Sequence, residues 1–398
     1  MKKTIFITLL FAFSIVARPQ SGFDNVMKQI ETNNTTLKAY DQQRQASRAG
    51  NHTGINMENP EVEFGRKWGT NSKAEGYKYD VGVTQTFDFP TAYHHKKKLA
   101  KDQDQISDLT YMEQRNEILN EARIIYIELL YQKIMCRELL ERKLVADQLF
   151  DATEKRFKSG DIDVLERNKA KINQINAEKA LQLCEVEVDV LTSELTRING
   201  GVAVEWTDVS YPVTKALPIS FDDWYTSIEI NNPSIKLASQ QVEASRRQEQ
   251  LTKSLNLPKI SAGYRKAYEA GGHFSGFVVG MSIPLWGGKN TVKQRKAETV
   301  AMTVIYEDTR LQFRNELKKE YEKAIRLEKL LKEYDDVLNT SNNHELMLKA
   351  FNLGQLSLVG YLQELSIYYE LKDSYYSTEK DYYLAWSELM RWDTSFQN

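Results

Sequence analysis

Residues 77–90 read YKYDVGVTQTFDFP, and this stretch decides the fold. Apolar or aromatic side chains recur at nearly every second position, and a period of two is typical of a β-strand with one apolar face. Residues 59–68, NPEVEFGRKW, show the same alternation. We therefore predict a β-hairpin over residues 60–89, with the polar residues 70–76 as its connection.

A second window repeats this pattern later in the chain. Residues 277–283, FVVGMSI, alternate clearly, and residues 260–264, ISAGY, alternate less cleanly. The glycine-rich residues 269–272 supply a connection between them. These features predict a second β-hairpin over residues 258–285.

The two windows belong to a duplication of the whole sequence. At offsets of 198 and then 194 residues, identical residues fall in register: Pro60 on Pro258, Pro90 on Pro284, Gly160 on Gly354, and Ser193-Glu194-Leu195 on Ser387-Glu388-Leu389. The offset changes between the strands, where the first half has four more residues. We predict two structural repeats, residues 21–200 and 221–398, joined by a linker or equatorial segment at 201–220. Each repeat runs helix, two strands, long helix, turn and helix.

Helix breakers are nearly absent from the second part of each repeat. Proline does not occur there, and the first repeat has only Gly160 between residues 83 and 199. Such stretches, rich in Leu, Glu, Lys, Gln and Ala, favour helices. We predict helical hairpins over residues 91–198 and 286–392, and a long arm in each that would measure about 100 Å if continuous. The predicted fold is mainly α with a small β part.

Composition and the N-terminus restrict the classes of function. Lys and Arg number 53 against 55 Asp and Glu, a net charge of −2, which argues against a basic nucleic-acid-binding surface. Two Cys and five His make a disulfide scaffold or a multi-metal protein unexpected. Basic Met1-Lys2-Lys3 followed by thirteen mostly apolar residues is typical of a secretory signal peptide, which we place at residues 1–20.

Four strands of about ten residues have the length of outer-membrane strands. An open sheet edge in lipid leaves backbone groups unpaired, so four strands require copies from several subunits to close a barrel. Aromatic side chains near the strand ends are candidates for a membrane girdle. These candidates are Trp68, Tyr77, Tyr79, Phe87, Phe89, Tyr264, Tyr268 and Trp286. A soluble sandwich core is the alternative interpretation of the same aromatics.

In this order of elements the sequence resembles the TolC-like outer-membrane efflux protein family. The resemblance rests on the duplicated order, Asn59-Pro60 before a strand, Phe89-Pro90 and Ile283-Pro284 after the strand pairs, and an aromatic-x-x-Gly turn at residues 157–160 and 351–354. It implies a homotrimer whose long helical hairpins form an α-barrel tunnel across the periplasm. Each chain would give four strands to a 12-stranded transmembrane β-barrel in the outer membrane, and the tunnel would meet a periplasmic adaptor protein and an inner-membrane efflux pump.

The resemblance also implies two sites. The adaptor-docking tip would comprise Lys158, Ser159, Gly160, Asp161, Leu353, Gly354, Gln355 and Leu356. An entrance gate of carboxylates would comprise Asp163, Glu166 and Glu364, although Gly360 stands where the second repeat would carry its acid. Residues 59–64 look like the CusC/CzcC-like branch paired with heavy-metal pumps, which makes heavy-metal cations a candidate cargo.

The two cysteines, Cys136 and Cys184, lie at equal distances before and after Gly160. In an antiparallel hairpin that reverses at Gly160, they would lie at about the same height on facing helices. A disulfide would persist in an oxidising periplasm, whereas burial as two small apolar side chains is the alternative. The sequence leaves both possibilities open.

The sequence offers little for an enzyme. His94-His95 stands in a basic run, and no His-Glu-x-x-His, Gly-x-Ser-x-Gly or phosphate-loop motif occurs. We therefore predict no catalytic, cofactor-binding or metal site and no nucleic-acid partner. The remaining alternative to a channel is a secreted periplasmic coiled-coil scaffold without a pore.

Overall fold

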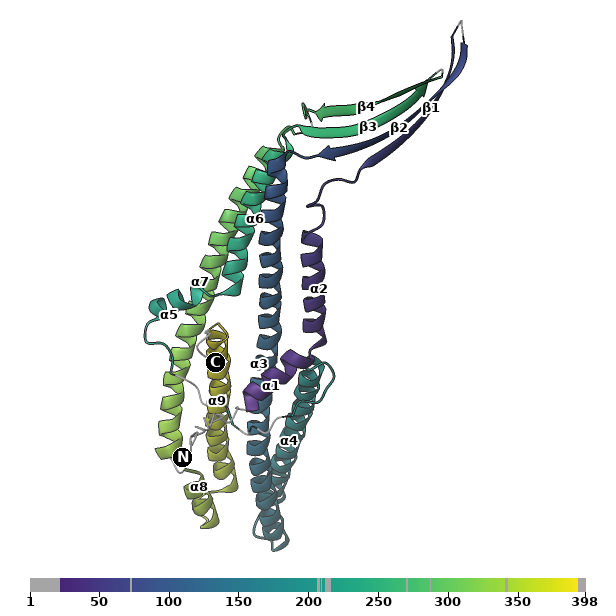
Figure 1. Ribbon diagram of the computed structural model, residues 1–398. Helices are drawn as coiled ribbons and strands as arrows, with labels where there is room; N and C mark the ends of the chain where they lie inside the picture. Colours follow the sequence, from purple (N-terminus) through teal and green to yellow (C-terminus); the bar gives the residue numbers. More distant parts are fainter. Residues whose placement is uncertain are drawn as a thin grey trace, which may run out of the picture. The chain divides into compact units, whose positions relative to one another are not determined.

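The computed structural model describes residues 22–392 except 72–73, 206–207, 209, 212–215, 270, 287 and 341–342. The predicted signal peptide lies outside this part. Figure 1 shows the elements, which follow in chain order: α1 Gly22–Asn33, α2 Thr35–Asn51, β1 Glu61–Asn71, β2 Ala74–Phe87, α3 Pro90–Lys158, α4 Val164–Ile198, α5 Phe221–Glu229, α6 Pro233–Leu255, β3 Lys259–Glu269, β4 Gly272–Ser282, α7 Thr291–Thr340, α8 Asn343–Asn352 and α9 Leu358–Met390.

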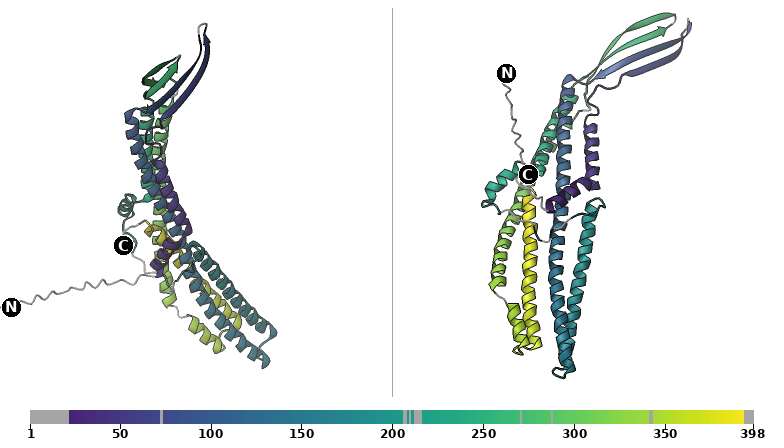
Figure 2. Two further views of the ribbon diagram at one scale, coloured as in Figure 1. Left: turned by 45° about the vertical axis from the view of Figure 1, so that its right-hand side comes forward. Right: turned by 60° about the horizontal axis from the view of Figure 1, so that its bottom comes forward.

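The chain forms two compact units. The first unit comprises Met1–Asn34, Glu121–Lys215 and Leu330–Leu384. The second unit comprises Thr35–Asn120, Ala216–Lys329 and Ala385–Asn398, and it contains all four strands. Both views of Figure 2 show α4 beside the C-terminal part of α3 within the first unit.

The four strands form one antiparallel sheet in the order β1-β2-β3-β4. Strands β2 and β3 pair along ten residues and so join the two repeats, from Lys78 opposite Glu269 to Phe87 opposite Ile260. The first hairpin is longer than the sequence indicated, because Gly69 pairs with Gly76 and Asn71 with Ala74. The prediction of a connection at residues 70–76 was therefore wrong: pairing across strands extends both of them through polar residues.

The long arm of the first repeat is one helix. Helix α3 runs for 69 residues without a break, as predicted. In the second repeat, the described residues of the arm form α7, with 50 residues, and α8, with 10. Residues 341–342, between these two helices, lie outside the described part. At the end of α7, Thr340 Oγ1 donates to the carbonyl of Asp336 at 2.5 Å.

The first helix of each repeat is likewise two helices. Helix α1 ends before Asn34, a buried residue whose side-chain amide donates to the carbonyl of Ile198 at 2.7 Å. Asn232 is the N-cap of α6 and accepts a hydrogen bond from the backbone N–H of Ile235 at 3.0 Å, with Pro233 at the first helical position. Asn232 thus marks the start of α6, and Asn34 separates α1 from α2.

Each unit has its own apolar core. In the second unit, Trp224 and Tyr225 of α5 pack with Phe313 and Leu317 of α7 and with Leu389 of α9. In the first unit, the core comprises Leu149, Ala170, Leu358, Tyr361 and Leu365. Among the described residues, no helix combines the length and apolar character needed to cross a membrane.

Candidate functional site

One face of the sheet is apolar and exposed. Neighbouring strands place apolar side chains opposite one another, for example Val62 with Val83 and Tyr264 with Phe277. Trp68 is 73% exposed and Phe277 is 88% exposed, which is not the burial of a sandwich core. We call this the apolar face, and it comprises Val62, Phe64, Trp68, Tyr79, Val81, Val83, Phe87, Ile260, Ala262, Tyr264, Tyr268, Phe277, Val279 and Met281, interrupted by a few polar side chains.

The opposite face carries charges and glycines, and we call it the polar face. Arg265 pairs with Glu63 at 2.7 Å, and Lys78 pairs with Glu269 at 2.8 Å. Glycine gives these side chains room: a Cβ on Gly65 would lie 2.5 Å from an Asp80 carboxylate oxygen. The sheet therefore has two faces of opposite character, divided by strand parity.

The predicted girdle residues are divided between the strands and their ends. Trp68, Tyr79, Phe87, Tyr264 and Tyr268 have the parity of the apolar face. Two others follow the strands: Phe89, after β2, is 36% exposed, and Trp286, after β4, is 83% exposed. The backbone of Tyr77 pairs with Trp68, and its side chain lies outside the described part. Their role as a girdle remains a prediction.

The first predicted tip follows α3. Gly160 has a φ of +81°, the left-handed backbone that a sharp helix stop requires. Its N–H donates to the carbonyl of Phe157 at 3.1 Å, and the N–H of Asp161 donates to the carbonyl of Arg156 at 2.9 Å. These two bonds define a Schellman motif with Gly160 at the residue after the cap.

The second tip, after α8, repeats this geometry. Gly354 has a φ of +72°. Its N–H donates to Phe351 at 3.0 Å, and the N–H of Gln355 donates to Ala350 at 2.9 Å. No side chain or backbone atom lies within 4 Å of a Cβ at Gly160 or Gly354 in the described structure, so the backbone conformation alone requires glycine.

The neighbouring side chains stabilise the first turn. Glu154 of α3 accepts a hydrogen bond from Arg167 of α4 at 2.6 Å and lies 3.6 Å from Lys158. The side chain of Ser159 bonds to Asp161 at 2.6 Å, so two predicted docking residues contact each other. Lys158 and Leu353 are both well exposed, with 73% of the Lys158 side chain and 64% of Leu353 accessible.

The structure explains one of the three gate candidates locally. Asp163 is the N-cap of α4, and its carboxylate accepts a hydrogen bond from the backbone N–H of Glu166 at 2.9 Å. In the second repeat, Ser357 accepts from the N–H of Gly360 at 3.1 Å, which is the equivalent bond. Glu166 is half-buried and Glu364 is exposed. A ring of such carboxylates needs several copies of the chain, and the gate stays a prediction.

The two cysteines are joined across the first helical hairpin. Cys136 of α3 and Cys184 of α4 form a disulfide with a Cα–Cα distance of 5.6 Å. This distance lies within the range that disulfides adopt. The bond covalently links the two helices of the first hairpin, 24 residues from Gly160 along each of them.

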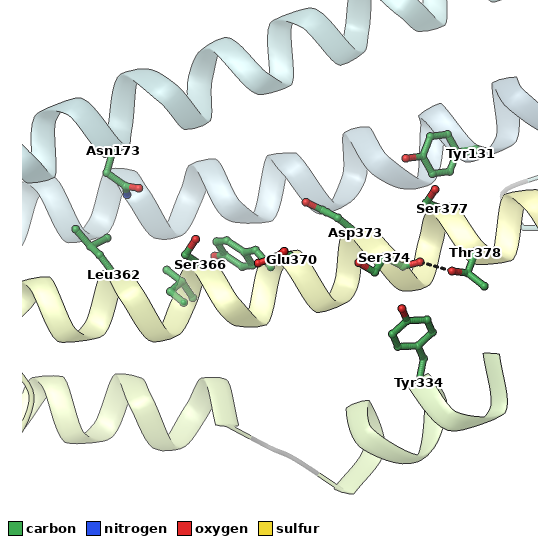
Figure 3. Close-up of a pocket in the computed structure, with 12 residues that line it drawn as sticks. Tyr131, Asn173, Tyr334, Leu362, Ser366, Glu370, Asp373, Ser374, Ser377 and Thr378 are labelled. Atoms are coloured by element: carbon green, nitrogen blue, oxygen red, sulfur yellow. Dashed lines mark hydrogen bonds between the residues drawn. The ribbon is translucent and has the colours of Figure 1, made fainter. Parts of the chain in front are cut away.

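Sequence reasoning missed a polar groove on α9 in the first unit. Figure 3 shows Tyr131 of α3 and Tyr334 of α7 on opposite sides of α9, whose Ser374 and Ser377 lie between them. The available signal was a tyrosine repeat at seven-residue spacing, which keeps one helix face: Tyr361, Tyr368, Tyr375 and Tyr382, with Tyr369, Tyr376 and Tyr383 beside them.

One acid near this groove has an altered proton affinity. Burial raises the pKa of Glu379 to about 7, and the nearby charge of Asp335 acts in the same direction. Tyr383, four residues further along α9, stacks on Tyr211 with ring centroids 4.1 Å apart. Glu379 therefore changes charge near neutral pH.

An ion-pair network with a buried centre, Arg142 and Glu138, joins α3 to α9 in the same unit. Arg142 donates two hydrogen bonds to Asp373, at 2.6 and 3.1 Å, and one to Glu138 at 3.1 Å. Lys372 donates to the other oxygen of Glu138 at 2.5 Å. All four groups are satisfied by each other, so this contact fixes the register of α9 against α3.

No known family model matches the sequence, and no curated protein matches it. Solved structures do match. The CusC structure superposes on 93% of this chain over 91% of its own length, with a TM-score of 0.78 and 14% sequence identity. The OprN structure also covers 93% of this chain, over 89% of its own length, with a TM-score of 0.81 and 14% identity. CmeC of Campylobacter jejuni gives 0.78 at 13% identity over 93% of this chain and 85% of its own.

These three structures are described as channels: a transmembrane channel for CusC, and outer-membrane channels for OprN and CmeC. The chain therefore has the fold of the outer-membrane channels, mainly helical with a four-stranded antiparallel sheet. The resemblance to the TolC-like family is thereby confirmed as a likeness of fold.

Proposed function

We propose that this chain is the outer-membrane channel component of a tripartite efflux system. Three copies would join in one passive duct, with a 12-stranded β-barrel in the outer membrane and a helical tunnel in the periplasm. The observation that carries this proposal is the division of the sheet into an apolar and a polar face. In the described part of the chain, β1 and β4 each pair with only one other strand.

The two end strands explain why copies must assemble. Unpaired backbone groups at the outer edges of β1 and β4 would be costly in lipid. Pairing β4 of one copy with β1 of the next closes the sheet and removes every edge. The apolar face would then contact lipid and the polar face would line the duct, as in outer-membrane barrels.

The two tips support the remaining part of the proposal. Gly160 and Gly354 end their helices with the same hydrogen-bonding pattern, so three copies would present six similar turns. A ring of equivalent turns fits an adaptor that carries repeated helical hairpins. The exposed residues Lys158 and Leu353 would contact that adaptor, and the pump would deliver its cargo through the assembly.

Heavy-metal cations are the finer proposal for the cargo. Residues 59–64 support it by their likeness to the heavy-metal branch, and Glu166 supplies a carboxylate near the entrance. Among the described residues, no group of three or more His, Cys, Asp or Glu side chains could hold a metal ion. Silver, copper, zinc and cobalt tolerance of a deletion strain, measured with and without this gene, tests the cargo.

Three measurements on the natural protein test the channel itself. It should fractionate with outer membranes and require detergent for extraction, cross-linking should stop at three subunits, and the purified protein should conduct ions in planar bilayers. Extraction by salt alone with no conductance would instead indicate the periplasmic scaffold. A closed monomeric barrel would contradict the shared-barrel proposal.

A further inference from the structure

Two cations interrupt the apolar face of the sheet. Arg66 of β1 and Lys266 of β3 have the parity of the apolar face, as the pairs of Arg66 with Tyr79 and of Val81 with Lys266 show. Within the described residues, neither has a carboxylate within ion-pair distance. The Arg66 guanidinium instead lies 5.1 Å from the ring centre of Trp68 and 5.3 Å from that of Tyr79.

The cations of the polar face are different. In the described strands, every lysine and arginine of that parity has a carboxylate partner. These cations are Lys67 with Asp80, Lys78 with Glu269, Lys259 with Asp88, and Arg265 with Glu63. The described cations of the polar face thus have acidic partners, whereas Arg66 and Lys266 on the apolar face have none in the described part. Solubility alone therefore does not explain why Arg66 and Lys266 stand on the apolar face.

Arg66 lies at the middle of β1, and Lys266 lies three residues before the end of β3. Along β3, Tyr268 is eight residues beyond Ile260, the position opposite Phe87. Eight residues rise about 27 Å along a strand, or about 20 Å along the axis of a barrel whose strands tilt by about 40°. An apolar band is about 25 Å tall, so the row of Arg66 lies about 5 Å inside its outer edge and Lys266 about 10 Å inside it. Long Lys and Arg side chains can extend toward the interface from such depths.

Aromatic and hydroxyl groups surround these cations. One cross-strand row consists of Arg66, Tyr79, Tyr268 and His273, with Tyr268 and His273 ring centroids 5.1 Å apart. A pocket opens between β2, β3 and β4, lined by Tyr79, Val81, Lys266, Ala267, Tyr268 and His273. Arg66 and Lys266 stand two strands and one row apart, a spacing of about 12 Å between their backbones that their long side chains can span.

From this arrangement, and resting on the proposed barrel, we infer that Arg66 and Lys266 bind the phosphate groups of an anionic lipid in the outer leaflet. Guanidinium groups bind phosphate in a bidentate manner and ammonium groups bind it as point charges. The acyl chains would lie on Phe64, Val81 and Tyr264 of the same face. No Asp or Glu has this parity in the strands until Glu75, beyond Tyr77.

The lipid supplies what the protein lacks at this level. A cation on the lipid-facing surface is costly at the membrane midplane and costs much less near the interface. Near the interface, each such cation raises the affinity of the protein for an anionic headgroup by about fivefold. The observed pair is therefore placed where a negative headgroup can neutralise both charges.

The test compares lipid binding by the intact detergent-solubilised assembly and its variants. Lipid A with two phosphates is titrated, and binding is followed by native mass spectrometry and by the temperature at which the assembly dissociates. We expect Arg66→Gln and Lys266→Gln each to weaken binding by about fivefold, and both together by about 25-fold. Lys67→Gln, the adjacent cation of the polar face, should bind like the natural protein, and Arg66→Lys should retain most of the affinity.

The controls separate the possible explanations. Equal binding by the double variant, or equal stabilisation by dephosphorylated lipid A, would overturn the inference. Equal stabilisation by inorganic phosphate at the same concentration would show that the site takes a free anion and not a lipid, and would overturn it too. Failure of the natural protein to enter outer membranes would instead contradict the channel proposal, and that is measured before any lipid is added.

Discussion

The two repeats share their turns but differ in their arms. Both tips end in a Schellman motif, at Gly160 and at Gly354, and the helix after each begins with an N-cap, at Asp163 and at Ser357. The two tips are therefore alike in their backbone and capping hydrogen bonds.

The arms differ in how they are held. The disulfide of the first hairpin has no equivalent in the second, where Leu330 and Thr378 stand at the positions of Cys136 and Cys184. Conversely, Glu379 of the second hairpin is partly buried, whereas its counterpart Glu185 is exposed. In each case one repeat carries the feature and the other has a different residue or environment at the matched position. The matched position can therefore serve as the control for a substitution.

The largest expected effect is on the disulfide. Its two cysteines are 48 residues apart, and closing a loop of that length stabilises a fold by about 4 kcal/mol in the chain-entropy model. We expect Cys136→Ala with Cys184→Ala to lower the unfolding midpoint in guanidinium, since the unfolded first hairpin gains freedom. The tips and the sheet should be unaffected.

Reduction supplies the control for this prediction. Dithiothreitol should destabilise the natural protein to the level of the double variant and leave that variant unchanged. Thiol labelling of denatured, non-reduced protein should detect no free cysteine. Two labelled thiols per chain would show that Cys136 and Cys184 are small buried side chains in the native protein, which is the alternative that the sequence left open.

The second prediction concerns Glu379 and pH. Its pKa is raised by burial to about 7 in the folded chain, against 4.5 in the unfolded chain. The folded state therefore retains a proton that the unfolded state releases, and the stability from this group is present below pH 4.5 and lost as the pH rises through 7. The full shift would correspond to about 3 kcal/mol, and screening by solvent reduces the contribution of this partly exposed carboxyl below that value.

Thermal unfolding between pH 5 and pH 8 checks this expectation. The natural protein should become less stable across that range, and Glu379→Gln should remove much of the slope because a neutral amide has no proton to lose. Glu185→Gln, at the matched exposed position, should leave the slope unchanged. An equal slope in the natural protein and in Glu379→Gln would contradict the raised pKa.

The third prediction concerns the shared tips. A β-branched side chain at φ values of +81° and +72° costs about 2 kcal/mol, because its Cβ approaches the backbone carbonyl. We expect Gly160→Val and Gly354→Val to distort the turns and abolish export, while assembly in the outer membrane continues. Antibiotic or metal tolerance and trimer yield are measured on the same strains.

Asparagine provides the matched substitution, because it tolerates the left-handed conformation. Gly160→Asn and Gly354→Asn should retain the turns and most of the export. If valine at both tips leaves export unchanged, the tips are solvated turns and the proposed adaptor contact is wrong. An effect at Gly160 alone would show that the two repeats are not equivalent in docking.

These regions also show what a sequence can predict. The parity of the strands and the left-handed glycines are local or periodic features, and the structure has both. The extension of β1 and β2 beyond residue 70 depends on cross-strand pairing, which a single strand pattern does not contain.

The candidate sites divide in the same way. Glycine at the tips follows from backbone sterics, and the two cysteines follow from equal spacing about a turn. The raised pKa of Glu379 depends on its burial and on the charge of Asp335 of α7, so the sequence of α9 alone did not indicate it. The position of Asp163 before α4 predicts a helix cap, whereas the resemblance to the channel family predicts a charge at the gate.

The smallest expected effect concerns the gate, where Glu166 of the first repeat corresponds to Gly360 of the second. Three copies would bring three Glu166 carboxylates toward one axis, and a ring of negative charge favours cations. Glu166→Gln should therefore lower the cation preference measured by reversal potential in planar bilayers, and Gly360→Glu should raise it by adding a second ring. Charges are screened beyond about 10 Å at 0.1 M salt and about 3 Å at 1 M, so both differences should shrink in 1 M KCl. Unchanged selectivity in both variants would contradict the gate. Glu166 would then be a residue in the first turn of α4, where its backbone N–H donates to the capping Asp163.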